Sequence, residues 1–414
     1  MKRPLLSGLI FAFCGYLSVS AQPKLPERSA PLVAQAGSAA GSRLNVSLYY
    51  SLPEDQSQVM QGFVQEFQQG HPFVNVQARN FGSSTELYSE LTSGRPLPSL
   101  AILESSWLPT LTQGTHLLPV ETWMPHETFL FNWSVKCNCY IPLWDAAHIG
   151  DNLMALPYFF TTRALILNND LLAKAGVKYP PVTWEQVAAA ASAIAKKGAT
   201  GFSLSPNNDP VQNARNFQLL AWQAGSPGLN TQPELNQDAY LQVVQTLQTM
   251  KESLLPVDGT KTGEVGLSIG TVADYLQERK EGLPVRSALI PGFDKSNRLT
   301  EAQSWDVGMF DTVPKSELYK VQEFAFFMLD FAQQRRWAEQ TPYLAAHVKV
   351  FENPFYRQAR LADHNSLRVF LNSLSKSKVV DTTSGARSIY GVVGKNLGQV
   401  IRGDRPVLNL TQAQ

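Results

Sequence analysis

The stretch from Leu153 to Gln186 constrains the fold of this chain more than any other part of its 414 residues. Two apolar segments come first, and their length and their aromatic and β-branched residues predict two strands. A short helical segment follows, and then the turn-forming pair Pro180-Pro181. Thr183, with Gln186 three positions later, predicts the start of a second helix. This order of elements is typical of a segment that packs against a sheet in an α/β fold.

The amino-terminal third alternates between strands and helices in the same way. Strand-like segments lie at 44–50, 74–78 and 99–104, and helical segments separate them. The alternation predicts a parallel sheet with helices on both faces, in which ligands bind beyond the carboxyl ends of the strands. Those ends point to three loops, which are Ser51–Glu54, Phe81–Thr85 and Glu104–Trp107.

Two further patterns predict helix boundaries. Ser51 with Glu54 three residues later is a capping box, which predicts that the first helix starts directly after Ser51. The apolar residues between 317 and 340 recur at helical spacing and predict one long helix.

Length, composition and charge limit the classes of function. A chain of 414 residues predicts two domains of ordinary size, and 44% hydrophobic with 17% charged residues is enough to form sizeable cores. The formal net charge of +1 gives no electrostatic reason to expect nucleic acid or an anionic membrane as a partner, and a neutral small solute fits it. The sequence has no H-E-x-x-H or P-loop motif, and its spacing singles out no pair of catalytic carboxylates.

The amino terminus has the pattern of a secretory signal peptide over residues 1–21. A basic start and an apolar segment precede the small residues Val19-Ser20-Ala21, so we expect export to a periplasmic or other extracytoplasmic location. Cys14 leaves lipid attachment open as an alternative to cleavage after Ala21. Residues 22–42 are rich in Pro, Ala, Gly and Ser and predict a flexible leader.

Cys137 and Cys139 form a C-x-C pair in the predicted mature chain. The pair is compatible with a local disulfide, with two free thiols, or with a redox or metal pair. No second Cys or His pair at zinc spacing accompanies it, and we therefore expect no metal and no cofactor.

Three motifs, in the same order, resemble the extracellular solute-binding proteins of the maltose and glycerol-3-phosphate type. The first is Leu44–Phe67 followed by His71-Pro72, which is similar to a family pattern F…F…HP. The second joins Ala155–Tyr158 to residues 165–170 and Thr183-Trp184, which is similar to LPY…T..L.YN.DL…AG…P.TW, with Leu167 in place of the usual tyrosine. The third joins residues 325–331 to Trp337 and Thr341–Leu344, which is similar to A..F..F…W…TGYLP, with Pro342 in place of glycine. The resemblance covers residues 44–403.

The resemblance implies a periplasmic-binding-protein-like α/β fold of two doubly wound lobes with a ligand cleft between them. We expect residues 43–156 plus 304–341 to form lobe 1, and residues 157–303 plus 342–414 to form lobe 2. The resemblance also implies a binding protein rather than an enzyme. Such lobes close around a solute, and the protein, expected to be a monomer, presents it to the permease of an ABC importer.

The same resemblance suggests which residues contact the ligand. Aromatic rings cover the apolar face of a sugar, while polar groups bind its hydroxyls. Tyr343 occupies the tyrosine position of the third motif, and Trp305-Asp306 replaces a glycine-rich turn, which predicts a smaller or more aromatic pocket. The expected ligand-binding residues are Glu104, Ser105, Thr161, Thr162, Thr271, Trp305, Asp306, Tyr343 and Tyr390.

A sugar, oligosaccharide or polyol is the expected solute, because no basic cluster is seen to converge on the predicted cleft. Glycerol-3-phosphate or another sugar phosphate is an alternative, since Arg387 and Tyr390 lie near a family arginine position. Arg163 is equally well explained as a salt-bridge former at the hinge. A secreted carbohydrate-active enzyme is the alternative from another functional class.

Overall fold

The structure is a computed structural model, and it describes residues 44–123, 138–229, 237–257, 264–316 and 318–412. These belong to the compact unit that spans residues 43–414. The predicted signal peptide with Cys14, the leader at 22–42 and Cys137 lie outside the described residues.

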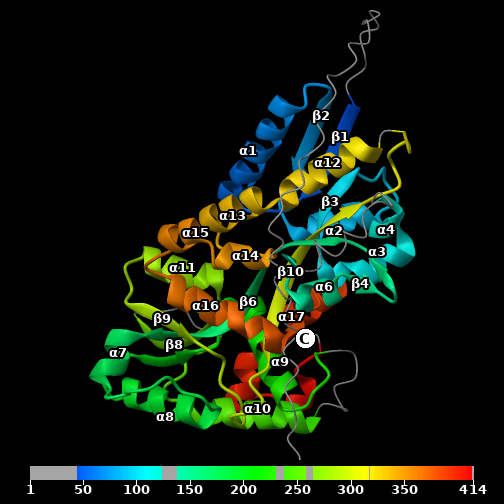
Figure 1. Cartoon of the computed structure of the whole chain (residues 1–414). Helices are drawn as coiled ribbons and strands as arrows, with labels where there is room; N and C mark the ends of the chain where they lie inside the picture. Colours follow the sequence, from blue (N-terminus) through cyan, green and yellow to red (C-terminus); the bar gives the residue numbers. More distant parts are fainter. Residues whose placement is uncertain (1–43, 124–137, 230–236, 258–263, 317, 413–414) are drawn as a thin grey trace, which may run out of the picture. The chain divides into compact units, whose positions relative to one another are not determined.

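The described strands form a ten-stranded sheet and a separate hairpin of two short strands (Figure 1). The main path runs β2-β1-β3-β10-β6-β8-β7. Its strands are β1 (Leu44–Tyr50), β2 (Val74–Asn80), β3 (Leu100–Glu104), β6 (Leu156–Asn168), β7 (Thr200–Ser203), β8 (Val265–Thr271) and β10 (Thr300–Met309). The strands β1, β2 and β3 are parallel to one another, as are β7 and β8, which confirms the predicted α/β class.

The long strand β6 belongs to two arms of this sheet. Its first half pairs with β10, and its second half pairs with β8 and β9 (Val285–Ala288). Every one of its 13 residues is buried, as expected for a strand covered on both faces. The short strands β11 (Leu344–Ala345) and β12 (Ser377–Val379) pair with β6 and β10, and β4 (His148–Ile149) and β5 (Asn152–Leu153) form the hairpin.

Helices cover both arms of the sheet. Near β1, β2 and β3 lie α1 (Glu54–Gly70), α2 (Ser84–Thr92), α3 (Leu108–Gly114), α12 (Leu318–Leu329) and α13 (Phe331–Gln340) (Figure 1). Near β7 and β8 lie α7 (Asn169–Lys174), α8 (Trp184–Ala195), α9 (Pro210–Gln223) and α10 (Gln237–Thr249). The others are α4 (Val120–Trp123), α6 (Ile141–Ala146), α11 (Val272–Lys280), α14 (Val348–Phe351), α15 (Pro354–Ala359), α16 (His364–Ser373) and α17 (Ser384–Arg402).

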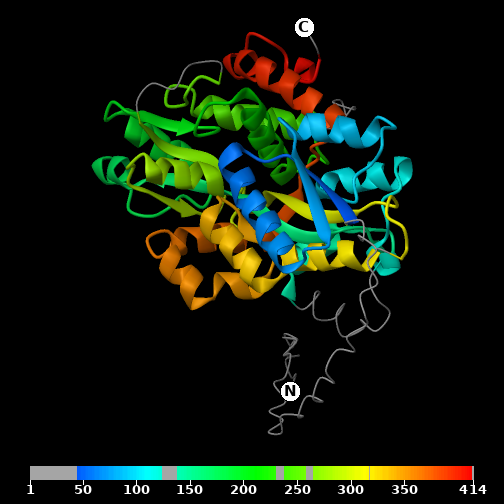
Figure 2. The same ribbon diagram turned by 90° about the horizontal axis from the view of Figure 1, so that it is seen from above.

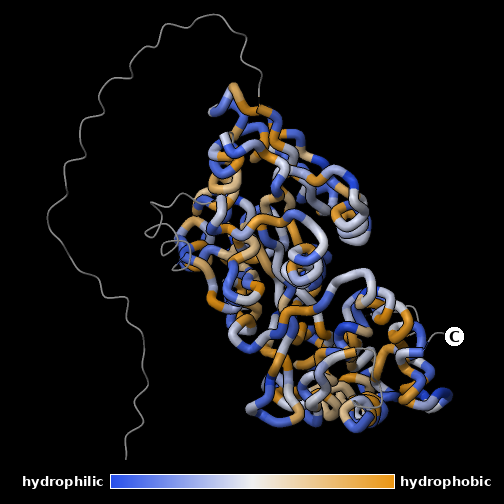
Figure 3. Tube along the Cα trace, turned by 90° about the vertical axis from the view of Figure 1, so that its right-hand side faces the viewer, coloured by the Kyte–Doolittle hydropathy of each residue, from blue (hydrophilic) through white to orange (hydrophobic). Residues whose placement is uncertain are grey.

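Hydrophobic and hydrophilic residues are interspersed along the described trace (Figure 3). In α1 the buried residues, among them Met60, Phe63 and Phe67, recur at helical spacing, as one-sided burial requires. None of the helices among the described residues is long and apolar enough to cross a membrane.

The buried apolar side chains form two clusters, and both include residues of β6. The first core cluster contains the side chains of Leu156, Tyr158, Phe159 and Phe160 together with side chains of β1, β3, β10 and α13. The second core cluster contains Leu165 and Leu167 together with side chains of α8, α9, α10 and α17. The buried apolar residues between 344 and 374 belong to the first cluster, and those between 380 and 410 belong to the second. The predicted lobe boundaries themselves stay a prediction.

Two predicted helix boundaries are wrong. Helix α1 begins at Glu54 with Pro53 as its N-cap, because the Asn80 side chain bonds both the N–H and the C=O of Leu52 at 2.9 Å and keeps the preceding residues in a loop. The long helix expected over 317–340 is two helices, because Asp330 is extended and its carboxylate caps α13 by accepting from the Ala332 N–H at 3.0 Å.

Helix α17 packs directly against α9 in the second core cluster, and Figure 2 shows the carboxy-terminal helix from above. Gly394 permits this contact, since an added Cβ would lie 2.2 Å from the Pro210 carbonyl oxygen. Close packing here matters because Arg215 of α9 reaches β10 and Arg387 of α17 reaches Glu104 of β3, as described below.

We predict that Gly394→Ala destabilises the protein by about 1–3 kcal/mol, because overpacking forces α17 away from α9. Gly391→Ala is the matched control on the same helix, where an added Cβ meets nothing within 4 Å. It should be neutral or should stabilise by up to about 1 kcal/mol through helix propensity. Urea unfolding of both variants measures the difference, and equal effects would contradict the packing.

Candidate functional site

The strand β10 carries polar and aromatic residues at a spacing of two. Glu301, Gln303 and Trp305 therefore project from the same face of the sheet. Gln303 is paired with Thr161 of β6, and Trp305 is paired both with Phe159 of β6 and with Glu104 of β3. Directly paired residues share a face. We use the name site face for the side chains of Glu104, Phe159, Thr161, Arg163, Glu301, Gln303 and Trp305.

One end of the site face is aromatic. The Trp305 ring stacks on Phe159, with centroids 5.1 Å apart and an angle of 25° between planes. Tyr343, which follows α13, lies edge-on to Trp305 at 4.9 Å and parallel to Trp337 at 6.4 Å. Burial raises the pKa of Tyr343, and the nearby Glu104 charge raises it further. An aromatic cluster and a carboxylate are thus neighbours here.

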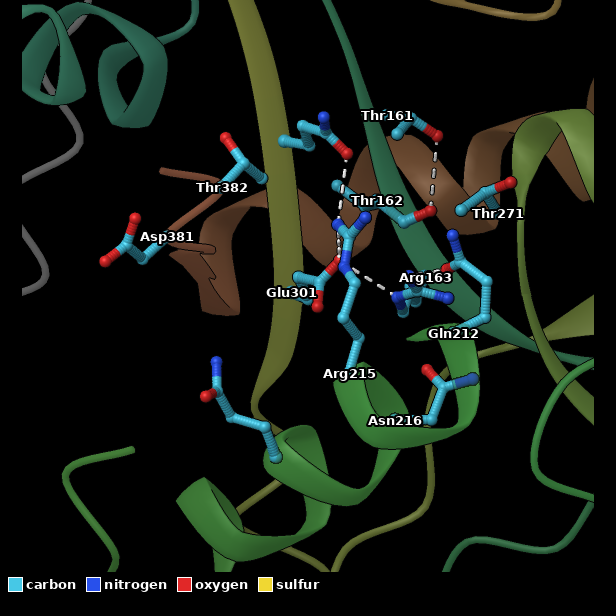
Figure 4. A network of polar contacts seen from close by, with 12 residues as sticks. Thr161, Thr162, Arg163, Gln212, Arg215, Asn216, Thr271, Glu301, Asp381 and Thr382 are labelled. Atoms are coloured by element: carbon cyan, nitrogen blue, oxygen red, sulfur yellow. Dashed lines mark hydrogen bonds and ion pairs between the residues drawn. The ribbon is translucent and has the colours of Figure 1, made fainter. Parts of the chain in front are cut away.

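The other end of the site face is charged and buried. Glu301 of β10 accepts hydrogen bonds from Arg163 of β6, at 3.0 Å, and from Arg215 of α9 (Figure 4). The Arg163 and Glu301 side chains are 1% and 2% exposed, which leaves almost no solvent to screen them. Burial alone would raise the pKa of Glu301, but the two guanidinium groups outweigh it and hold that pKa below its usual range. The carboxyl is therefore ionised at neutral pH.

A continuous chain of hydrogen bonds connects the charged end to the aromatic end. Arg215 donates to the Gln303 amide oxygen at 3.0 Å, and the Gln303 amide nitrogen donates to Glu104 at 2.9 Å. The other oxygen of Glu104 accepts from Arg387 of α17 at 3.0 Å. Arg387 also donates to the Thr382 carbonyl at 2.7 Å. The chain links β3, β6, β10, α9 and α17, and hence side chains from both core clusters.

Six of the nine predicted ligand-binding residues lie on or beside the site face, namely Glu104, Thr161, Thr271, Trp305, Tyr343 and Tyr390. Thr271 is paired with Arg163, but its hydroxyl donates to Asp274 at 2.8 Å and caps α11. The Tyr390 hydroxyl accepts from Gln218 at 3.1 Å and donates to the Asp381 carbonyl at 3.0 Å. Solute binding by these six residues stays a prediction.

Ser105, Thr162 and Asp306 lie on the opposite face of the sheet. The Ser105 hydroxyl donates to the Asp306 carboxylate at 2.5 Å, and the Thr162 hydroxyl donates to the Phe370 carbonyl at 2.6 Å. Burial raises the pKa of Asp306 to about 7, against the opposing effect of the Ser105 and Ser304 hydroxyls. Solute binding by these three residues also stays a prediction, and their side chains do not share a face with the other six.

Sequence reasoning missed Gln212, Arg215, Glu301 and Gln303. A signal was present in α9, where Asn213, Arg215 and Asn216 interrupt a buried helix with polar residues. The expectation that no basic cluster converges on the site also needs correction. Three guanidinium groups, those of Arg163, Arg215 and Arg387, lie along the chain of hydrogen bonds, where two carboxylates offset them.

A G-x-S-x-G pattern occurs at Gly266–Gly270, which sequence reasoning overlooked. In nucleophile elbows, the serine of this pattern sits on a sharp strand-to-helix turn. Ser268 instead lies inside β8, where it is paired with Ile166 and Ser203 and is 3% exposed. The pattern therefore does not form a nucleophile site.

A cavity of about 260 Å³ opens elsewhere, between the start of β6, α12 and α13. Its lining contains none of the nine predicted ligand-binding residues. Cys139, which does line it, is a buried free thiol whose pKa is raised by burial and by the Asp306 charge. Within the described ranges, no group of three or more His, Cys, Asp or Glu residues could hold a metal ion.

We predict that Glu301→Gln destabilises the protein by about 3–5 kcal/mol, because it leaves two buried guanidinium groups without a counter-charge. Glu352→Gln is the matched control, since Glu352 pairs with Arg368 at side-chain exposures of 58% and 41%. That exposed pair should contribute less than about 1 kcal/mol. Urea unfolding at pH 7 compares them, and a small effect of Glu301→Gln would mean that the buried charges are solvated.

We also predict a pH dependence from Asp306. Its pKa is about 7 in the folded protein, whereas that of an unfolded aspartate is about 3.9. The folded state therefore holds more protons between these values, and the free energy of unfolding falls as pH rises through this window. Asp306→Asn should remove that slope, while Asp311→Asn, at an exposed position, should retain it. Denaturant titrations at several pH values test this, and an unchanged slope in Asp306→Asn would exclude the assignment.

Comparison with known proteins supports the fold and the family. A putative binding protein of Brucella abortus (strain 2308) is 25% identical over 254 residues, which are 58% of this chain and 59% of that protein. A putative binding protein of Brucella suis biovar 1 (strain 1330) matches to the same extent. The match thus spans about three fifths of the length of these curated relatives.

Solved structures of similar fold cover nearly the whole chain. The cyclic α-maltosyl-1,6-maltose binding protein from Arthrobacter globiformis superposes with a TM-score of 0.71 at 17% identity, covering 89% of this chain and 96% of that one. UgpB from Mycobacterium tuberculosis in complex with glycerophosphocholine gives a TM-score of 0.71 at 15% identity, covering 91% and 96%. Residues 50–335 match the family described as bacterial extracellular solute-binding protein. Because this match covers more than half of the chain, the protein belongs to the bacterial extracellular solute-binding proteins.

Proposed function

We propose that this protein is the substrate-binding component of an ABC importer and that it takes a neutral carbohydrate or polyol on the site face. Family membership supports a binding role, and an extracytoplasmic location with a membrane permease as partner follows from that role. The observation that carries the solute class is the aromatic cluster of Phe159, Trp305 and Tyr343 beside the Glu104 carboxylate. Aromatic rings suit the C–H face of a sugar, and a carboxylate accepts from its hydroxyls.

A phosphorylated polyol is the second candidate. It is favoured by the three arginines along the chain of hydrogen bonds, because guanidinium groups bind phosphate well. A glycerophosphocholine complex is also among the similar folds. The neutral solute is preferred because Arg163 and Arg215 already bind Glu301, and Arg387 already binds Glu104.

A glycosidase needs one carboxylic acid with a raised pKa and a second carboxylate facing the same bond. On the site face, the pKa of Glu301 is lowered by its two arginines. Asp306 has the raised pKa, but it lies on the opposite face and is fully buried. The pattern of charges therefore supports binding over hydrolysis.

We predict that Trp305→Ala and Tyr343→Ala each weaken solute binding by about tenfold to a hundredfold, since a buried aromatic contact contributes about 1–3 kcal/mol. Tyr179→Ala is the control, because this tyrosine is 80% exposed and lies between α7 and α8, outside the site face. This variant should bind like the parent. A thermal-shift screen of sugars, polyols and their phosphates first selects the solute, and a solute at 100 times its Kd should stabilise the fold by about 2.7 kcal/mol.

Isothermal titration calorimetry then compares the variants after circular dichroism has established that they are folded. Unchanged affinity in both folded aromatic variants would rule out the site face as the binding surface. Binding of phosphorylated solutes only, with strong salt dependence, would favour the second candidate. Release of cleaved sugar during titration would favour an enzyme.

A further inference from the structure

The Gln303 side chain lies between a cation and an anion. Its amide oxygen accepts from the Arg215 guanidinium at 3.0 Å, and its amide nitrogen donates to the Glu104 carboxylate at 2.9 Å. The reverse orientation of the amide would place N–H against N–H and oxygen against oxygen, so the two charged neighbours fix it. Arg215 lies in α9, and Glu104 ends β3, so this one side chain joins two distant parts of the fold.

Only a side-chain amide of this length can accept from Arg215 and donate to Glu104 at the same time. A glutamate at position 303 accepts from Arg215 but has no proton for Glu104 when ionised, and a lysine donates to Glu104 but repels Arg215. The backbone contributes to the fit, since Glu104 is paired with Trp305, two residues beyond Gln303 on the same face. Both carboxylate oxygens of Glu104 are thereby held, one by Gln303 and the other by Arg387.

We infer that Gln303 is a positioning residue that sets the solute specificity of the site face, by fixing the Glu104 carboxylate as an acceptor beside the aromatic cluster and by engaging Arg215. A fixed carboxylate selects solutes that donate hydroxyl protons and repels phosphate. The Nη2 group of Arg215 bonds both Glu301 and Gln303, and its Nε is buried, so these two nitrogens are not exposed to an anionic solute. The inference rests on the proposed function and assigns the selective role to a residue that need not touch the solute.

The charged and titratable groups around this pair come from several elements. They are Arg215 of α9, Arg387 of α17, Glu301 of β10 and Arg163 of β6, together with Tyr343 and Tyr390. Burial raises the pKa of both tyrosines, and that of Glu301 is lowered, so none of these three changes its charge between pH 5 and 8. Asp306, with a pKa of about 7, lies on the opposite face and is common to all the variants compared below.

The test uses Gln303→Glu, which places two carboxyl groups side by side. Such a pair retains one proton to higher pH, and the shared proton replaces the amide N–H that Glu104 has lost. At pH 5, the variant should bind a neutral probe, maltose or D-mannitol, nearly as well as the parent. At pH 8, both carboxylates are charged and repel each other, and the affinity should be lower than that of the parent by a factor of about ten or more.

Gln212→Glu is the matched control. The side chain of Gln212 also accepts from an arginine, Arg163, but among the described residues no hydrogen bond joins its side-chain amide nitrogen to a carboxylate. Its affinity should vary with pH as the parent does. Calorimetry from pH 5 to pH 8 on the parent and both variants gives the profiles, and parallel profiles would overturn the inference.

Gln303→Met removes both hydrogen bonds without adding charge, and it keeps the test valid if Gln303→Glu does not fold. It releases Arg215 from Gln303, although not from Glu301, so the ratio of affinity for maltose or D-mannitol to affinity for sn-glycerol 3-phosphate should fall about tenfold or more at constant pH. An unchanged ratio would overturn the inference, because a merely structural role would weaken both probes alike.

Unfolding without solute separates this inference from the proposed function. If the carboxyl groups of Gln303→Glu share a proton, its free energy of unfolding falls with rising pH more steeply than that of Gln212→Glu. A steeper fall in a protein that binds none of the probes would reject the proposed solute class while leaving the Gln303 bridge in place. Equal slopes would reject the bridge, whatever the protein binds.

Discussion

The ion triad of Arg163, Glu301 and Arg215 is the interaction on which the arrangement of the site depends. Moving charges out of water costs several kcal/mol for each group, and only close pairing with hydrogen bonds offsets that cost. The pairing forms only when β6, β10 and α9 stand in one particular relation, since each supplies one member. The triad therefore disfavours other packings of these three elements and fixes where Gln303 and Trp305, further along β10, face the site.

The sequence predicts local features well where a short pattern has no competitor. Thr183 caps α8 as predicted, with its hydroxyl accepting from the Gln186 N–H. Ser51 has the same pattern but caps nothing, because Asn80, 29 positions later in the sequence, binds the intervening Leu52 backbone. The periodicity from 317 to 340 is helical throughout, yet Asp330 divides it by capping a second helix. Both errors arise from side-chain to backbone bonds, which hydrophobic periodicity does not detect.

In the site, too, some residues could be predicted from the sequence and others depend on contacts that are remote in sequence. The family resemblance suggests Glu104, Trp305 and Tyr343 as ligand contacts, and the structure brings these three together. Which neighbours share their face depends on the register of β10 against β6, which shifts between Trp305 and Asp306. A shift of one residue exchanges the faces of a strand. Asp306, adjacent to Trp305 in sequence, faces away from the site because side chains alternate along β10. Arg215, remote in sequence, lies beside Gln303 because it also pairs with Glu301 two residues earlier on the same face.

We propose that solute binds on the face formed by β3, β6 and β10. A crystal structure of the protein with the best solute from a thermal-shift screen tests it most directly. We expect solute against the rings of Trp305 and Tyr343, with a hydroxyl donating to Glu104 and the triad of Arg163, Glu301 and Arg215 unchanged. Solute bound instead in the cavity between β6, α12 and α13, or displacing Glu301 from its arginines, would contradict it.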